Sequence, residues 1–328
     1  MPPLLDKENV KMTDCTDCNV FQFCQFLKLL GKIMIILVLL IVGMTYYAVI
    51  IATAVPGLHE GGAGNVTWCL FVFVTFHFLI IMLLWSYFTA VATDPGRVPP
   101  GWHPFSDEEE AAYELERLNY ASYQPANKSI RPRFCKKCQA WKPPRTHHDS
   151  MSGTCVLKMD HYCIWVLNCV GLLNYKAFLL FLAYTFLATL LATIALVNGF
   201  VQYFKELQEE DLEPSAKPAI LFLAFVIDAA FALAIVGFLV MHCRMIARNM
   251  TTIEMYEKRR HSTGAWPFDR GAKHNFLEVF GRSRLRWFVP AYTKEEVREL
   301  LSNSLNSRPP DSADSAELAL PRSFSNNV

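Results

Sequence analysis

Long apolar runs dominate the pattern of hydrophobic and polar positions along this chain. Four runs with very few charges cover residues 33–55, 68–91, 177–204 and 219–242. A helix needs about 20 apolar residues to cross the hydrocarbon core of a bilayer, and each run is long enough. Buried helices of a large soluble protein are the alternative, but too little polar chain is left to enclose four of them. The pattern predicts an all-α polytopic membrane protein with four transmembrane helices.

Composition supports this prediction, because 52% of the 328 residues are hydrophobic. The first run follows a polar lead, residues 1–32, and it is too long to be the core of a signal peptide. We therefore expect it to stay in the mature protein as a membrane span. The apolar runs divide the chain into that N-terminal segment, spans one and two with their short connection (33–91), a loop at 92–176, spans three and four (177–242) and a tail at 243–328.

Basic residues predict the orientation of these spans. The loop at 92–176 and the tail at 243–328 are rich in Lys and Arg, whereas the connection at 56–67 contains neither. Such residues accumulate on the cytoplasmic side of membrane proteins. We therefore expect both termini and the long loop to be cytosolic, with the tail disordered from about residue 303, where it becomes rich in Ser, Asn and Pro. Cytosolic cysteines are kept reduced, so they are better candidates for ligands or nucleophiles than for disulfides.

The long loop contains a block of cysteines and histidines at about 131–175. Zinc is held by four nitrogen or sulfur ligands in a tetrahedron, and two cysteines on one tight turn can supply two of them. Cys135 and Cys138 have that spacing. Either His147 or His148, together with Cys155, could complete the site. Such a site would be structural, because no ligand position stays open.

The sequence DHYC at 160–163 has the composition of a nucleophile with its base. A thiol becomes reactive when a neighbouring base takes its proton or stabilises its thiolate. His161 lies two residues from Cys163, and Asp160 could orient the imidazole ring and stabilise its cationic form. The residues alone leave a second interpretation open, in which His161 and Cys163 are themselves zinc ligands.

This block resembles the cysteine-rich domain of the DHHC family of protein S-acyltransferases, or palmitoyltransferases, with DHYC as a variant of the family's motif. Three further segments resemble family motifs: TDPG at 93–96, TTIE at 251–254 and KHNFLEVFG at 273–281. The layout of four spans, with the cysteine-rich domain between the second and third, is also similar, and the sequence around the spans is most similar to the plant branch. The resemblance implies a zinc-bound cysteine-rich cytosolic domain.

The resemblance also implies which residues bind metal. The family domain has two zinc sites, and the first falls on Cys135, Cys138, His148 and Cys155, all of which are present. The second would fall on four positions that here hold Asp149, Ser152, Tyr162 and Cys169. Asp149 and Cys169 alone make a poor zinc site, so we predict one structural zinc ion instead of two.

The activity implied is transfer of a palmitoyl or similar acyl group from acyl-CoA to cysteines of membrane-associated proteins. By resemblance, Cys163 carries the acyl thioester, His161 is the base and Asp160 orients it. Trp165 is expected to contact the acyl chain, although an interfacial anchor is an equal alternative. Thr252 is expected to help hold Asp160. The partners are acyl-CoA, substrate proteins and the lipid bilayer, with no nucleic acid, and the membrane is the Golgi or another endomembrane, with the plasma membrane as alternative.

Two other functions compete with this one. A membrane scaffold that has lost activity would account for the missing second zinc site, since a structural zinc can supply much of a small domain's folding energy. A transporter or channel would rest on the four spans and on Asp228, an acid within the fourth span, and acids in spans are functional candidates. A neutral Asp228 hydrogen-bonded to another helix is the simpler interpretation of that residue. Three cysteines before the first span, Cys15, Cys18 and Cys24, are candidates for lipidation or plain reduced thiols.

Overall fold

The computed structural model describes residues 18–105, 109, 113, 133–206, 216–261 and 266–306. Cys15 and the tail beyond residue 306 lie outside these residues, as do the side chains of Cys18 and Cys24. The predictions made for them therefore stay predictions.

Four long apolar helical segments cover the four predicted runs, and the chain is an all-α polytopic membrane protein. The first span is built from α1 (Cys18–Tyr46), the π-helix η1 (Tyr47–Ala54) and α2 (Val55–Glu60). The other spans are α3 (Ala63–Ala92), α5 (Tyr175–Glu206) and α6 (Ala216–Ala247). Each is long enough to cross the hydrocarbon core with residues to spare, because a helix rises about 1.5 Å per residue.

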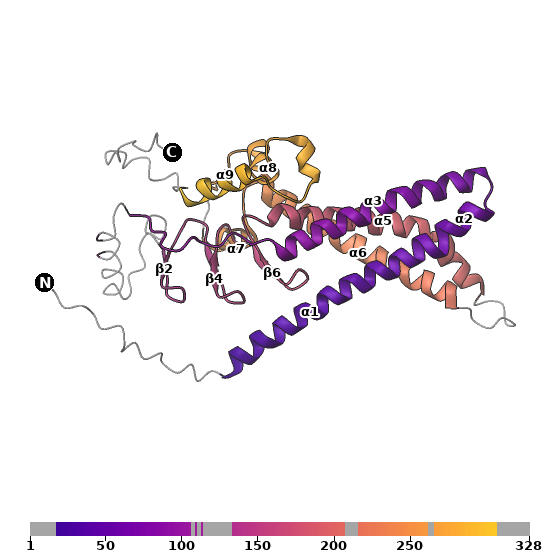
Figure 1. The fold of residues 1–328 in the computed structure, drawn as a ribbon, viewed down its shortest axis with the longest axis horizontal. Helices are drawn as coiled ribbons and strands as arrows, with labels where there is room; N and C mark the ends of the chain where they lie inside the picture. The colour runs from indigo at the N-terminus through magenta and orange to yellow at the C-terminus, as the bar shows by residue number, and fades with distance from the viewer. Residues whose placement is uncertain are drawn as a thin grey trace.

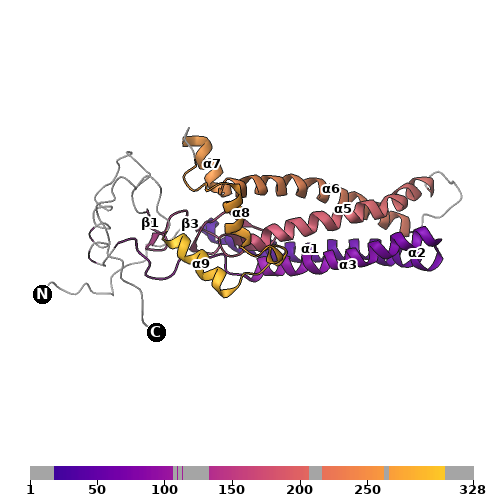
Figure 2. The ribbon, with the colours of Figure 1, turned by 90° about the horizontal axis from the view of Figure 1, so that it is seen from above.

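Helix α5 is the centre of the bundle, and it packs along both α3 and α6 (Figure 2). Its apolar stretch is the most buried of the four, which is why Phe178, Ala192 and Leu196 are almost fully enclosed. Helix α1 instead slants away from the others toward its N-terminal end (Figure 1). The first span therefore contacts α5 and α6 mainly through η1, the segment that follows α1.

Pro56, two residues after the end of η1, explains why this segment is a π-helix. Pro56 at the start of α2 has no backbone N–H and its ring clashes with the preceding turn of an α-helix. A wider π turn accommodates that missing bond, and the Val55 N–H accordingly donates to the carbonyl of Ile50. Ala48, Val49 and Ile50 are buried there against the other spans.

Three short β-hairpins form the cysteine-rich domain, at the end of the bundle where α5 begins and α6 ends (Figure 1). The first pairs β1 (Arg133–Cys135) with β2 (Ala140–Lys142). The second pairs β3 (His147–Asp149) with β4 (Thr154–Val156), and the third pairs β5 (His161–Cys163) with β6 (Asn168–Val170). Strands of three residues cannot form a sheet that is stable alone, so these hairpins depend on what ties them together.

The C-terminal part packs back onto the same end of the bundle. It contains α7 (Thr252–His261), α8 (Ala272–Phe280), the 3-10 helix η2 (Arg284–Phe288) and α9 (Lys294–Leu305). The buried Asn275 of α8 donates to the carbonyl of Ala247, one of the unpaired carbonyls that end α6. Lys158, from the hairpin domain, forms an ion pair with Glu278 of α8 at 2.7 Å. Helix α8 therefore bridges the hairpins and the fourth span.

Candidate active site and metal centre

The three hairpins have equivalent positions that recur at a regular spacing in the sequence. Cys135, Asp149 and Cys163 each end the first strand of their hairpin, and they follow one another at intervals of fourteen residues. The cross-strand pair His148 and Cys155 of the second hairpin likewise has a counterpart in Tyr162 and Cys169 of the third. Equivalent positions of successive hairpins therefore carry the predicted zinc ligands and the predicted nucleophile.

One group of donors has the geometry of a metal site. It joins the turn of the first hairpin to the cross-strand pair of the second, through Cys135, Cys138, His148 and Cys155. Their donor atoms all lie within 4.8 Å of one another, and the sulfurs of Cys138 and Cys155 are 3.7 Å apart. Two thiolates bound about 2.3 Å from one tetrahedral ion would be about 3.8 Å apart. The donor set thus fits zinc in both chemistry and spacing.

His148, and not its neighbour His147, supplies the nitrogen of this site. Its Nδ1 lies 3.1 Å from the Cys138 sulfur and 3.6 Å from the Cys135 sulfur. Successive side chains of a strand point to opposite faces, so only one of the two histidines in β3 can face the first hairpin. The choice between the two histidines, which ligand spacing left open, is therefore made by strand geometry.

The three residues Asp160, His161 and Cys163 lie together, away from the zinc-site donors. His161 Nδ1 donates to Asp160 Oδ2 at 2.7 Å. Asp160 is also held from the start of α7, where Thr252 donates its backbone N–H (2.8 Å) and its hydroxyl (2.9 Å). Among the described residues, neither His161 nor Cys163 belongs to a group that could hold a metal ion. The arrangement matches an oriented base beside a free thiol.

Electrostatics favour charge separation in this trio. Burial by itself would raise the pKa of Asp160, but the bonds from His161 and Thr252 and the nearby imidazoles outweigh it and hold the pKa below its usual value. Burial alone would lower the pKa of His161. Its contacts with Asp160 and Cys163 outweigh burial and raise the pKa to about 9. The folded structure therefore favours the imidazolium form of His161.

A cavity of about 560 Å³ opens from this trio into the bundle. His161, Cys163 and Trp165 are among the residues that line it, and most of its wall is made of aliphatic and aromatic residues of α1, α3, α5 and α6. Trp165 is 39% exposed and makes an edge-to-face contact with Phe231 of α6. The site thus combines a thiol, an oriented base and an apolar cavity of the size that holds small ligands.

Comparisons with known proteins fit this geometry. The sequence model described as DHHC palmitoyltransferase matches residues 128–259. Over 273 residues the chain is 50% identical to "Probable protein S-acyltransferase 14" of Arabidopsis thaliana, an alignment that covers 82% of this chain and 87% of that protein. This chain belongs to the DHHC palmitoyltransferase family. It is also 31% identical over 280 residues to "Palmitoyltransferase ZDHHC20" of Homo sapiens, covering 80% of this chain and 74% of that protein.

In this chain, residues at the positions of the family's second zinc site make hydrogen bonds and apolar contacts. Asp149 is buried and accepts hydrogen bonds from the backbone N–H groups of Met151 and Ser152, so both of its oxygens close its own turn. Cys169 packs in an apolar cluster with Val156, Met159 and the partly buried Tyr162. Burial raises the pKa of the Cys169 thiol well above its usual range. Asp149 therefore closes the turn of the second hairpin, and the small apolar cluster connects that hairpin to the third.

The TDPG segment fixes this DHHC domain to the second span. Asp94 accepts from the N–H groups of Gly96 and Arg97, and the Gly96 carbonyl accepts from the Leu157 N–H at 2.8 Å. Gly96 has φ +102°, and a Cβ on it would lie 3.2 Å from the Leu172 side chain. Both features require glycine at this position.

Sequence reasoning missed Asn168, which lies between the predicted nucleophile and Cys169. Its amide donates to the carbonyls of Ala90, Val91 and Thr93, which are left unpaired at the end of α3. Asn168 therefore fixes the third hairpin, and Cys163 with it, on the end of the second span. No pattern in the sequence signals such a cap, because its partners lie more than seventy residues earlier in the chain.

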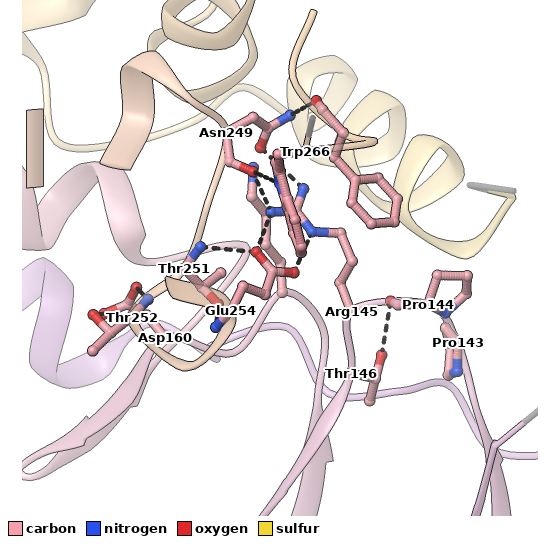
Figure 3. A network of polar contacts seen from close by, with 12 residues as sticks. Pro143, Pro144, Arg145, Thr146, Asp160, Asn249, Thr251, Thr252, Glu254 and Trp266 are labelled. Carbon is pink, nitrogen blue, oxygen red and sulfur yellow. Dashed lines mark hydrogen bonds and ion pairs between the residues drawn. The ribbon is translucent and has the colours of Figure 1, made fainter. Parts of the chain in front are cut away.

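Sequence reasoning also missed Arg145, one of the basic residues of the loop at 92–176. Its guanidinium forms two 2.7 Å hydrogen bonds with the carboxylate of Glu254, and it donates to the side chain and carbonyl of Asn249 (Figure 3). Glu254 also accepts from the Thr251 N–H. The network thereby fixes the segment that presents Thr252 to Asp160. The glutamate of TTIE was the one sequence signal that pointed to it.

Removing one partner of this ion pair should destabilise the protein strongly. The side chains of Arg145 and Glu254 are only 8% and 4% exposed, so Arg145→Ala would leave an unpaired buried carboxylate. We expect a loss of about 3–5 kcal/mol in the free energy of unfolding, measured by chemical denaturation in detergent. Arg282→Ala, which breaks the exposed pair with Glu299, should change it by less than about 0.5 kcal/mol. Equal losses in both variants would contradict this assignment.

Stability should also depend on pH through His161. The folded protein raises the pKa of His161 from 6.5 to about 9, so it binds this proton more tightly than the unfolded chain does. The resulting stabilisation is complete below pH 6.5 and is lost as the pH rises through about 9. The difference in thermal midpoint between the wild type and His161→Gln should therefore shrink across this window. A difference that stays constant with pH would contradict the assignment.

Proposed function

We propose that this chain is a protein S-acyltransferase that moves a palmitoyl or similar fatty acyl group from acyl-CoA to cysteine thiols of proteins. A thioester on Cys163 is the intermediate. The observation that carries the proposal is the position of Cys163, between an Asp160-held imidazole and the mouth of an apolar cavity. The names of the relatives, protein S-acyltransferase and palmitoyltransferase, support it.

In the first half-reaction the Cys163 sulfur attacks the thioester carbonyl of acyl-CoA. A new bond forms between that sulfur and the acyl carbon, and the bond between the acyl carbon and the CoA sulfur breaks. His161 takes the proton of Cys163 before the attack and returns it to the departing CoA thiolate. Asp160 stabilises the imidazolium that holds the proton in between, and Thr252 keeps Asp160 in place through its two hydrogen bonds.

In the second half-reaction a protein thiol replaces CoA as the partner. His161 accepts its proton, the thiolate attacks the acyl carbon, and Cys163 leaves as a thiolate that recovers the proton from His161. One thioester is exchanged for another in each half, so the free energy changes little and no nucleotide is required. The acyl chain stays in the apolar cavity, with Trp165 against its first carbons, and each buried CH2 adds about 0.8 kcal/mol to binding.

One structural zinc ion completes the domain in this proposal. Cys135, Cys138, His148 and Cys155 would hold it, and it would tie the first two hairpins together. The second and third hairpins would need no metal between them, because the apolar cluster around Cys169 connects them.

The distribution of Lys and Arg supports an orientation with both termini and the DHHC domain in the cytosol. The active site would then face cytosolic CoA esters and cysteines of membrane-associated proteins, close to the bilayer surface. The Golgi or another endomembrane is the proposed location, with the plasma membrane as alternative. In that orientation the domains are the cytosolic segments 1–32, 92–176 and 243–328 and the two pairs of spans between them.

Incubation of the purified protein in detergent with alkyne-tagged palmitoyl-CoA tests the function. We expect a protein adduct that hydroxylamine removes, since hydroxylamine cleaves thioesters, and release of CoA in equal amount. Transfer of the label to a cysteine peptide bearing a membrane anchor should follow. A folded protein that gains no label would favour the inactive scaffold, which the changed second zinc site otherwise supports.

A further inference from the structure

The cavity that begins at Cys163 ends at an acid. Asp228 of α6 lines its deep end, is only 1% exposed and accepts a hydrogen bond from the Thr45 hydroxyl of α1 at 3.1 Å. Its second oxygen, Oδ2, is buried without a hydrogen-bond partner among the described residues. A buried polar atom without a partner is costly, so such an atom facing a ligand cavity indicates that something else pairs with it.

A fatty acyl chain on Cys163 is long enough to reach this carboxyl group. Phe238 lines the cavity near the trio, and Asp228 is ten residues deeper on the same helix, which is about 15 Å at 1.5 Å per residue. An extended palmitoyl chain is roughly 19 Å long, since its C–C bonds of about 1.5 Å zigzag. The far end of the chain would therefore lie beside Thr45 and Asp228.

The other polar residues at this end are already satisfied. Thr185 and Thr189, which line the cavity on α5, donate to carbonyls of their own helix, those of Phe181 and Thr185. Thr45 donates to the other oxygen of the same carboxyl group. A methyl group placed against Oδ2 would leave that oxygen unpaired whether the carboxyl is ionised or protonated, whereas a hydroxyl could both donate and accept.

We propose that Asp228, positioned by Thr45, forms a polar subsite for the far end of the acyl chain. It selects acyl-CoAs whose terminal carbon carries a hydroxyl group over methyl-ended chains of the same length. This inference rests on the proposed function, because it is the thioester on Cys163 that directs the chain into the cavity. Sites built to hydrogen-bond a substrate hydroxyl discriminate strongly against analogues that lack it.

The test compares palmitoyl-CoA with ω-hydroxypalmitoyl-CoA as acyl donors and measures the hydroxylamine-labile adduct by intact-protein mass spectrometry. For each protein the readout is the labelling rate with ω-hydroxypalmitoyl-CoA divided by the rate with palmitoyl-CoA. This ratio is independent of the fraction of active protein. We expect Asp228→Leu to lower this ratio about tenfold relative to the wild type. Thr45→Val should lower it less, because it removes the residue that positions the carboxyl. Thr193→Val, on a face of α5 outside the cavity lining, should leave the ratio unchanged.

A shorter donor pair locates the effect along the cavity. Octanoyl-CoA and ω-hydroxyoctanoyl-CoA extend only about 10 Å and end before Asp228, so their ratio should be the same in the wild type and in Asp228→Leu. Equal ratios for the palmitoyl pair in wild type and Asp228→Leu would overturn the inference while leaving the acyltransferase intact. Absence of any hydroxylamine-labile adduct, with every donor, would instead mean that the proposed function has failed. Asp228→Ala, which also removes both carboxyl oxygens, replaces the leucine variant if that variant does not fold.

Discussion

Replacing Cys163 with serine is expected to abolish the hydroxylamine-labile acyl adduct and to reduce acyl transfer by at least about a thousandfold. A serine hydroxyl at neutral pH is a far weaker nucleophile than a thiol, and any ester it formed would resist mild hydroxylamine treatment. The fold should persist, because serine differs from cysteine by one atom in a side chain that is 7% exposed. The measurement is gel fluorescence of the alkyne label, with CoA release followed in parallel.

Two other cysteines provide matched controls for this prediction. Cys169 is buried six residues after Cys163 in the same hairpin, and Cys243 is an exposed thiol in α6. Cys169→Ser and Cys243→Ser should each keep the label. If Cys163→Ser were labelled as strongly as the wild type, the acyl group would be attached elsewhere and Cys163 would have lost its proposed role.

The second large effect is expected from the metal site. Cys155→Ser should release the proposed zinc ion and unfold the first two hairpins, because the ion would hold these three-residue strands together. Structural zinc sites contribute about 10–16 kcal/mol of binding free energy, which is also folding free energy. We expect the zinc content per chain to fall from one to zero and acyl labelling to fall with it. Elemental analysis of the purified protein and the labelling assay measure the two losses.

Cys169→Ser is the matched control here as well, because Cys169 is the counterpart of Cys155 in the third hairpin. It should keep one zinc ion per chain and most of the activity, with a modest loss of stability from the disturbed apolar cluster. Two zinc ions in the wild type, or metal loss in Cys169→Ser, would show that the second site still binds metal despite Asp149, Ser152 and Tyr162.

The roles of Asp149 and Tyr162 are an example of what could not be predicted from the sequence. The changed ligand set predicted the loss of a metal site, because ligand chemistry is a property of residue types. The interactions that the residues at these positions make could not be predicted. Closure of the turn by Asp149 depends on the backbone of β3 and β4, and the packing of Tyr162 and Cys169 depends on Met159 and on Ile253 from another part of the chain.

Sequence alone determined the features that depend on local spacing and on composition. The four spans follow from the length and apolarity of their runs, and the first zinc site and the DHYC trio follow from ligands and reactive groups that lie within about thirty residues of one another. The general chemistry of this DHHC family member could therefore be inferred from the sequence without the tertiary structure.

Tertiary structure decided the contacts between distant segments. Arg145 meets Glu254 across 109 residues, Thr252 meets Asp160 across 92, and Thr45 meets Asp228 across 183. Hydrophobic periodicity gives the face of a helix that is buried, but it does not give the neighbour that covers that face. That choice is made when the spans and hairpins pack together, and this packing places Asp228, an acid within a span, in the lining of the apolar cavity.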